Sequence, residues 1–216
     1  MNELATREIL WNVNTTANIV AMYVVFAISL IFGIAGLFSN AELIRSGHPA
    51  PEHLGQYKRR LFDFFRDVVL QRRTVKSRTP GIAHTLVYVG FLALLFATTV
   101  VFLENDLGLK IYHGNFYLFI TVTSDVLGAA SLIGIAIFAH RRYVQKPDLI
   151  HSRAIDTWAL VAFTLLIIQG FCLEGLRIHH GDISGNPDLW KHYSPVGLLF
   201  SKLFWGLSIE STKYVH

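Results

Sequence analysis

Hydrophobic residues gather in four long segments that are separated by polar stretches. The segments cover about residues 19–39, 81–103, 116–140 and 155–173. A helix of about 20 residues, rising 1.5 Å per residue, is long enough to cross the hydrocarbon core of a bilayer. The pattern therefore predicts an all-α integral membrane helical bundle with four transmembrane helices.

A fifth apolar stretch, residues 195–209, is too short to cross a bilayer. We expect it to form an interfacial helix with Trp205 at the depth of the lipid headgroups. Residues 1–16 are mixed and polar, so we expect an N-terminal segment outside the membrane, followed by one membrane domain over residues 17–216.

Basic residues cluster in two loops, residues 45–78 and the connection between the third and fourth predicted helices. By the positive-inside rule these loops are cytoplasmic. We therefore expect a multi-pass protein of the cell inner (cytoplasmic) membrane with its N-terminus on the outer side. Their concentration at these two places indicates orientation rather than nucleic-acid binding. The two loops hold 13 of the 19 Lys and Arg residues: Arg45, Lys58, Arg59, Arg60, Arg66, Arg72, Arg73, Lys76, Arg78, Arg141, Arg142, Lys146 and Arg153.

Apolar residues are interspersed with the basic residues of the first loop, and this pattern has two interpretations. It fits an amphipathic helix lying on an anionic inner leaflet. It fits equally well a docking surface for a cytoplasmic redox domain. The apolar residues are Leu61, Phe62, Phe64, Phe65, Val68, Val69 and Leu70.

Only one cysteine, Cys172, is present, and it lies within the fourth apolar segment. A four-cysteine iron–sulfur site and a structural zinc site both need more thiolates than this. Any iron–sulfur cluster must therefore be carried by a partner domain or subunit.

His84 is the strongest candidate for cofactor chemistry, because it lies in the first turns of the second predicted helix. A polar side chain at membrane depth is costly without a partner, and a neutral imidazole is a good axial ligand for haem iron. Its helical face continues through Tyr88, Phe91, Leu95 and Thr98, which would form an apolar and aromatic wall. The alternative is an interfacial histidine held by a backbone carbonyl or a lipid headgroup. No histidine lies ten to fourteen residues further on, so this helix can anchor one haem at most.

Two further histidines, His113 and His216, are predicted on the outer side and could share a second haem site. His140 ends the third predicted helix at the depth of His84 and is a possible partner for it. For each of these three, a solvated position at the interface is the competing interpretation.

Charged residues within the predicted helices supply a possible quinone or proton site. Asp125 lies mid-helix, where a carboxylate serves either proton uptake or a hydrogen bond to a neighbouring helix. Glu174 and Arg177 are spaced to pair at i, i+3 and could bind a quinone carbonyl or form a structural ion pair.

Several local motifs resemble the nitrate reductase gamma-subunit-like cytochrome b membrane domain over roughly residues 17–216. The resemblance is greatest to the version fused to a cytoplasmic CCG-type iron–sulfur domain similar to heterodisulfide reductase subunits. The motifs are Gly114-Asn115-Phe116-Tyr117-Leu118 with Asp125 and Gly128, Arg141-Arg142-Tyr143-Val144 with Pro147, Gly170-Phe171-Cys172-Leu173-Glu174-Gly175-Leu176-Arg177-Ile178, Trp190, and Ser194-Pro195-Val196-Gly197.

The resemblance implies a haem b domain of a respiratory oxidoreductase. It would relay electrons between a cytoplasmic iron–sulfur domain, with electron-transfer flavoprotein as a possible donor, and the menaquinone or quinone pool. His84 matches the family's inner haem ligand, whereas the second ligand position on that helix is Leu94, which puts an outer haem in doubt. The remaining family ligands would lie beyond His216 on a fifth transmembrane helix, so the resemblance implies that the sequence ends just as this helix begins. Two other functions stay open: a haem-free membrane anchor for a redox enzyme, and a small ion or metal transporter.

Overall fold

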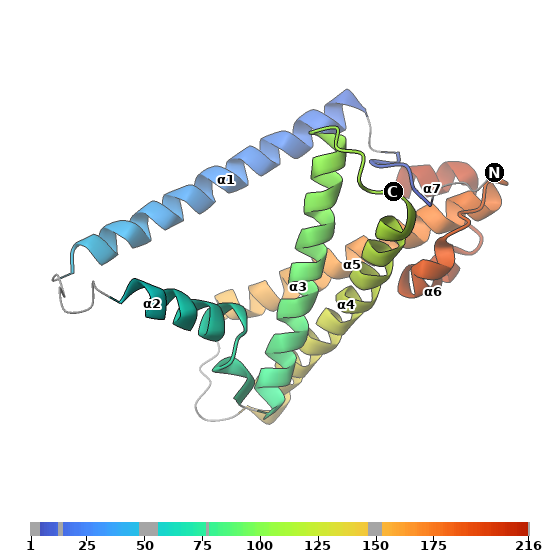
Figure 1. Ribbon diagram of the computed structural model, residues 1–216. Coiled ribbons are helices and arrows are strands. Elements are labelled where there is room, and N and C mark those ends of the chain that lie inside the picture. The colour runs from blue at the N-terminus through green and yellow to red at the C-terminus, as the bar shows by residue number, and fades with distance from the viewer. Residues whose placement is uncertain (1–4, 13–14, 48–55, 77, 147–152, 216) are drawn as a thin grey trace. The chain divides into compact units, whose positions relative to one another are not determined.

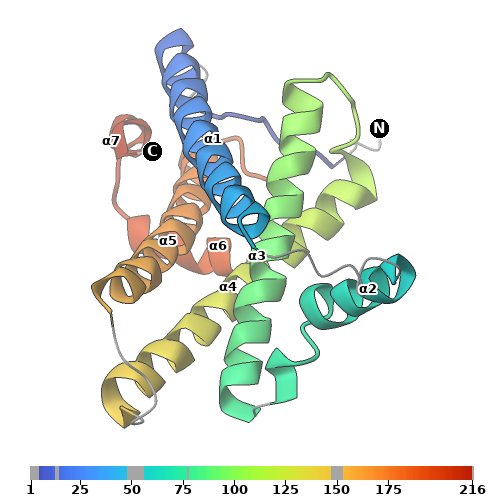
Figure 2. The ribbon, with the colours of Figure 1, turned by 90° about the vertical axis from the view of Figure 1, so that its left-hand side faces the viewer.

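The chain folds entirely into helices and connecting turns in the part that the computed structural model describes, which is residues 5–12, 15–47, 56–76, 78–146 and 153–215. It divides into two compact units, residues 10–70 and residues 1–9 together with 71–216. Figures 1 and 2 show the helices of both units from two directions.

The first unit contains α1 (Thr16–Arg45) and α2 (Tyr57–Phe64), and α2 continues as a π-helical turn, Phe65–Val69. Thr15 caps α1, because its hydroxyl accepts a hydrogen bond from the Asn18 amide at 3.4 Å. No residue of α1 is buried within the protein, although the helix is apolar all round. An apolar helix of this length with no protein core around it suits a lipid environment.

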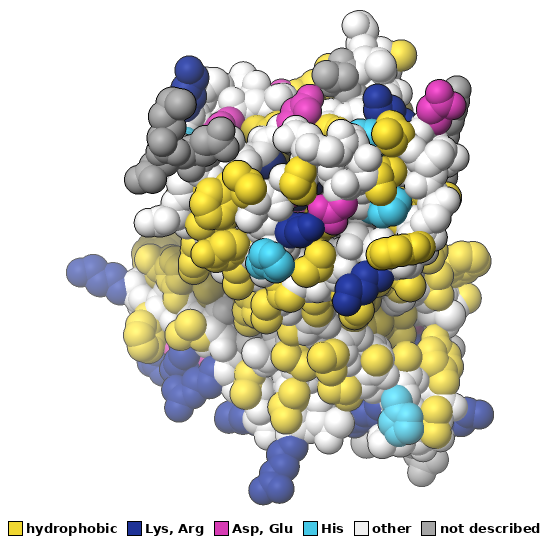
Figure 3. Space-filling view, turned by 90° about the vertical axis from the view of Figure 1, so that its right-hand side faces the viewer, with side chains coloured by type: hydrophobic (Ala, Val, Ile, Leu, Met, Phe, Trp, Pro, Cys, Tyr) yellow, Lys and Arg dark blue, Asp and Glu magenta, His cyan; other side chains and the backbone are white. Residues whose placement is uncertain are grey.

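The second unit contains the other three long helices, α3 (Arg78–Asn105), α4 (Gly114–His140) and α5 (Ala154–Ile183). A band of hydrophobic side chains crosses the face drawn in Figure 3. The shorter elements of this unit are a 3-10 turn Thr74–Lys76, a π-helical turn Arg141–Gln145, a 3-10 turn Lys191–Tyr193, α6 (Pro195–Ser201), a 3-10 turn Lys202–Phe204 and α7 (Ile209–Val215).

Small residues allow α3 and α4 to pack closely along their length. A Cβ added at Gly90 of α3 would lie 1.8 Å from Ser131 Oγ of α4. One at Gly134 of α4 would lie 2.7 Å from the carbonyl oxygen of Ala83. Ser131 also donates a hydrogen bond across the interface to the Leu86 carbonyl at 3.3 Å. Such contacts of small residues and hydroxyls stabilise helix pairs where lipid removes the hydrophobic driving force.

The short helix α6 packs against both α4 and α5. A Cβ at Gly175 of α5 would lie 2.9 Å from the backbone of Phe200, so α6 can approach this closely only because the side chain is absent. Gly197 and Ser201 of α6 are buried, whereas Trp205, just beyond it, is 88% exposed.

For the described residues, the prediction of an all-α fold with four helices long and apolar enough to span a membrane is confirmed. Each predicted segment lies within α1, α3, α4 or α5, and the helices extend further than the apolar runs. The largest difference is at α5, which continues through Ile183 because the charged side chains in its last turns find partners there. The interfacial position of residues 195–209 and the sidedness of the loops stay predictions.

Candidate functional site

His84 lies in the second turn of α3, at the end of the helix that follows the basic loop. Its half-buried imidazole Nε2 is 3.1 Å from the side-chain oxygen of Gln71. The ring also stacks on Tyr88, one turn further along, with 6.3 Å between ring centroids and 6° between the planes. The imidazole is therefore oriented by two neighbours at the edge of the predicted membrane span.

Gln71 is a contact of His84 that the sequence alone does not indicate. Its backbone has φ +53°, a left-handed conformation that is uncommon for a residue with a side chain. Its carbonyl oxygen accepts hydrogen bonds from the amides of Thr74 and Val75 at 3.0 and 3.1 Å. Its side-chain oxygen accepts a further bond from the Thr74 hydroxyl at 3.1 Å. This tight turn fixes the amide that meets His84.

The face of α3 beyond His84 is open in the described structure. Phe91 is 49% exposed and Leu95 is 50% exposed, and both lie on the helical face of His84 and Tyr88. The opposite face carries Gly90 and packs on α4. The helix thus buries one side against a neighbour and presents an apolar wall with an imidazole at one end.

This arrangement is compatible with His84 as one axial ligand of a haem. The porphyrin itself supplies four iron ligands, so the protein needs to add only axial side chains. Coordination through Nε2 would replace the hydrogen bond to Gln71. Among the described residues, no group of three or more His, Cys, Asp or Glu side chains is placed to hold a metal ion.

The other predicted haem ligands are not brought to His84 by any described contact. His113 precedes α4 and is exposed, with no capping hydrogen bond from its side chain. It lies at the far end of α4 from His140, which is also exposed and ends the helix on the side where α4 packs against Ala83. His216 lies outside the described residues, so the predicted pairing of His113 with His216 stays a prediction.

Glu174 and Arg177 form the predicted i, i+3 pair, near the end of α5. Arg177 Nη2 donates to Glu174 Oε1 at 2.8 Å, and Arg177 Nε donates to Glu174 Oε2 at 3.1 Å. Arg177 Nη2 also lies 2.8 Å from Asp188 Oδ2, and Arg7 Nη1 lies 3.2 Å from Glu174 Oε2. Ser194 donates a further bond to Glu174 Oε1 at 3.2 Å. Two arginines and two carboxylates therefore form a network with balanced charge.

This network has little contact with water. The side chains of Glu174 and Arg177 are each 16% exposed, and that of Asp188 is 12% exposed. Removing one partner of a buried ion pair leaves an uncompensated charge, which is strongly destabilising. The sequence predicts the Glu174–Arg177 pair from its spacing, but Arg7, Asp188 and Ser194 carry no local pattern that would add them to it.

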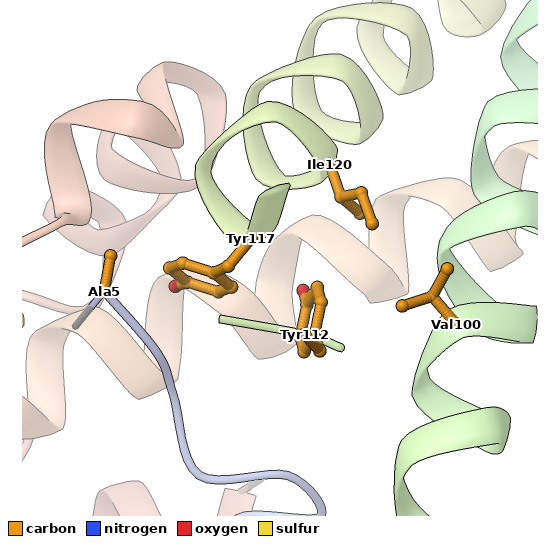
Figure 4. Close-up of a cluster of buried hydrophobic side chains, with 5 residues drawn as sticks. All are labelled: Ala5, Val100, Tyr112, Tyr117 and Ile120. Atoms are coloured by element: carbon orange, nitrogen blue, oxygen red, sulfur yellow. The ribbon is translucent and has the colours of Figure 1, made fainter. Parts of the chain in front are cut away.

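The N-terminal segment is held next to this network by a hydrogen bond and a cation–π contact. The Gly114 amide donates to the Ala5 carbonyl at 2.6 Å, and the Arg7 guanidinium lies 5.6 Å from the centre of the Tyr112 ring. Tyr112 packs edge-on against Tyr117 with 5.1 Å between ring centroids. Figure 4 shows these rings with the other buried members of the cluster, Ala5, Val100 and Ile120.

Asp125 forms a hydrogen bond to a neighbouring helix, one of the two roles expected for it. Its Oδ2 accepts from the Val196 amide at 2.7 Å and its Oδ1 from the Gly197 amide at 3.0 Å. The residue is only 6% exposed. Both amides belong to the first turn of α6, where helix geometry leaves N–H groups without partners, so Asp125 caps α6 from α4.

Comparison with known proteins gives one informative similarity. The chain is 24% identical over 201 residues to the EtfAB:quinone oxidoreductase of Syntrophomonas wolfei subsp. wolfei (strain DSM 2245B / Goettingen). The match covers 90% of this chain but only 28% of that protein. No protein-family model and no solved structure matches the chain. Nearly the whole chain is thus similar to one part of a quinone-linked oxidoreductase.

Proposed function

We propose that the chain is the membrane part of a quinone-linked electron-transfer oxidoreductase and that it binds one haem b through His84. The similarity to a quinone oxidoreductase supports the electron-transfer role in general. The haem, the resemblance to the nitrate reductase gamma-like domain and the partners go beyond that similarity.

The observation that carries the haem proposal is the environment of His84. Its imidazole is held by Gln71 and Tyr88 at one end of an exposed apolar wall on a helix long enough to span a membrane. A bound haem would supply one-electron transfer at this position. Gln71 would hold the imidazole only until Nε2 binds iron, and Phe91 and Leu95 would exclude water from the cofactor face.

The proposed electron donor approaches from the end of the bundle that carries the basic loops. A cytoplasmic iron–sulfur domain or subunit would deliver electrons there, with electron-transfer flavoprotein upstream of it, and quinone in the membrane would accept them. The Lys and Arg residues exposed next to His84 suit an acidic partner surface. They include Arg72, Lys76 and Arg78.

A quinone or proton role for Asp125, Glu174 and Arg177 remains a proposal with a clear constraint. Both oxygens of each carboxylate already accept hydrogen bonds from the protein. A quinone carbonyl at this end would therefore have to compete with the existing network or be bound by a neighbouring polar group.

The haem proposal is tested by a dithionite-reduced minus oxidised absorbance spectrum of the natural protein, purified in mild detergent after expression with a haem supply. His84→Ala is expected to abolish a b-type α-band. His192→Ala is the matched control, because His192 is an exposed histidine that is not among the predicted haem ligands. Gln71→Ala is expected to retain the band, because coordination of iron through Nε2 already replaces the hydrogen bond to Gln71.

Each outcome decides between the candidate functions. A band that is lost in His84→Ala but retained in His192→Ala supports axial ligation by His84. A folded wild-type protein without any b-type band would overturn the haem proposal and favour a haem-free anchor, which predicts normal partner activity in His84→Ala. Substrate flux into proteoliposomes without haem absorbance would instead favour a transporter.

A further inference from the structure

The helical segment made by α2 and its π-helical turn, residues 57–69, exposes several large apolar side chains in the described structure. Leu61 is 60% exposed, Phe62 is 65% exposed, and Phe64 and Phe65 are each 51% exposed. Aromatic and aliphatic side chains on a short helix are seldom this accessible unless another surface covers them.

The α2 residues are arranged on two arcs of the helix. With 3.6 residues per turn, Tyr57, Leu61 and Phe64 share one arc, and Lys58 and Arg60 lie on either side of it. Arg59 and Asp63 lie on the opposite arc, and Phe62 lies beside Arg59, with its ring centre 5.9 Å from the Arg66 guanidinium carbon. An apolar arc flanked by cations is typical of helices that lie in the plane of a membrane surface, with the cations among the headgroups.

The polar arc is already paired within the segment. Arg66 Nη2 lies 2.9 Å from Asp63 Oδ1, and Arg66 Nε lies 2.8 Å from Asp67 Oδ1. Arg59 Nε lies 4.0 Å from Asp63 Oδ2. These partners make the polar arc locally neutral, which suits a face toward water. The cations beside the apolar arc, Lys58 and Arg60, form no such pair in the described contacts.

The segment is also joined to the start of one predicted span, α3, by a short connection. Only residues 70–77 separate Val69 from Arg78, the first residue of α3. Fully extended, those eight residues reach about 28 Å. The tether is in fact shorter, because Gln71 hydrogen-bonds His84 and the 3-10 turn Thr74–Lys76 packs on Gly81 of α3. Chain connectivity alone therefore keeps the end of this segment within a short distance of the start of a predicted span.

We infer that residues 57–69 form a membrane-surface helix whose Tyr57, Leu61 and Phe64 insert among lipids and whose Lys58 and Arg60 bind anionic phospholipid headgroups. Charge complementarity and the short tether select the bilayer over a soluble protein as the occupant of this face. The inference does not depend on haem or on the direction of electron flow.

The test places one environment-sensitive fluorophore on each arc of the natural protein. Cys172→Ser supplies the background, and Leu61→Cys and Arg59→Cys are labelled separately and compared in lipid nanodiscs. The nanodiscs contain either phosphatidylcholine alone or phosphatidylcholine with about 30% phosphatidylglycerol. Because both leaflets of a nanodisc are alike, the orientation of the protein does not affect the comparison.

The Leu61 probe is expected to be quenched several-fold more by brominated lipid than the Arg59 probe, and more strongly when phosphatidylglycerol is present. Lys58→Gln together with Arg60→Gln should remove the dependence on phosphatidylglycerol and leave the two probes distinguishable. Equal quenching of both probes by aqueous iodide, with no effect of brominated lipid, would overturn the inference. Protection of the Leu61 probe by an added acidic protein alone would assign the face to a protein partner instead.

Discussion

Replacing Asp125 separates a structural role of this carboxylate from a role in proton transfer. Asp125→Ala removes the only acceptors that the structure shows for the Val196 and Gly197 amides. Both amides lie in the first turn of α6, where no intrahelical carbonyl is available to them. The variant should therefore loosen α6 from α4 while leaving the long helices intact.

The size of the effect follows from those two bonds. A hydrogen bond to a charged group contributes about 1.5–3 kcal/mol, and loss of a helix cap costs about 1 kcal/mol. The same two hydrogen bonds make up the helix cap, so the two contributions are not added. We expect Asp125→Ala to lower the free energy of unfolding by about 3 kcal/mol. Asp125→Asn retains one acceptor oxygen, so it should lower the free energy of unfolding by roughly half as much.

The assay is equilibrium unfolding by sodium dodecyl sulfate in mixed micelles, followed by circular dichroism. Ser124→Ala is the matched control, because the Ser124 hydroxyl bonds only the Ile120 carbonyl of its own helix at 2.7 Å. It should change stability by no more than about 0.5 kcal/mol. Unchanged stability in Asp125→Ala, combined with loss of quinone-linked turnover, would refute the capping role and favour proton transfer.

Two further predictions concern packing and charge, both measured by the same unfolding assay. Gly90→Ala should destabilise by about 1–3 kcal/mol because its Cβ would overlap Ser131 and force α3 and α4 apart, whereas Gly170→Ala, with nothing within 4 Å, should be neutral or slightly stabilising. Equal effects of the two variants would contradict the close packing. Glu174→Gln should lower the free energy of unfolding by about 3 kcal/mol, because it removes a negative charge that compensates buried arginines. Asp182→Asn, which affects a more exposed pair with a lysine, should lower it by less than about 1 kcal/mol. A Glu174→Gln variant as stable as wild type would show that the network does not contribute to the fold.

The arrangement of Glu174 and Arg177 connects three parts of the chain that are far apart in sequence. Arg7 comes from the N-terminal segment, and Asp188 comes from the loop after α5. The resulting network and the Tyr112–Tyr117 cluster lie together at the end of the bundle where α4 begins. This end is held by paired charges and aromatic packing, whereas the His84 end carries the open apolar wall proposed for the cofactor.

Hydropathy predicted the long helices well because a membrane-spanning helix is a local property. Its length and its lack of charge are set by the thickness of the bilayer, and both can be read from consecutive residues. The ends were less well predicted. Beyond residue 173 the α5 sequence becomes polar, yet the helix continues, because Glu174 pairs with Arg7 and Arg177 pairs with Asp188 outside the helix.

The sequence by itself determined the helical fold, the four candidate spans, the clustering of basic residues, and His84 as a polar group at a span end. Only the tertiary structure decided that His84 meets Gln71, that Asp125 caps α6, and that Arg7 joins Glu174 across 167 positions of sequence. The physical reason is the range of the interactions. Burial in lipid depends on each residue and its near neighbours, whereas a hydrogen bond or ion pair needs a partner that folding alone brings within about 3 Å.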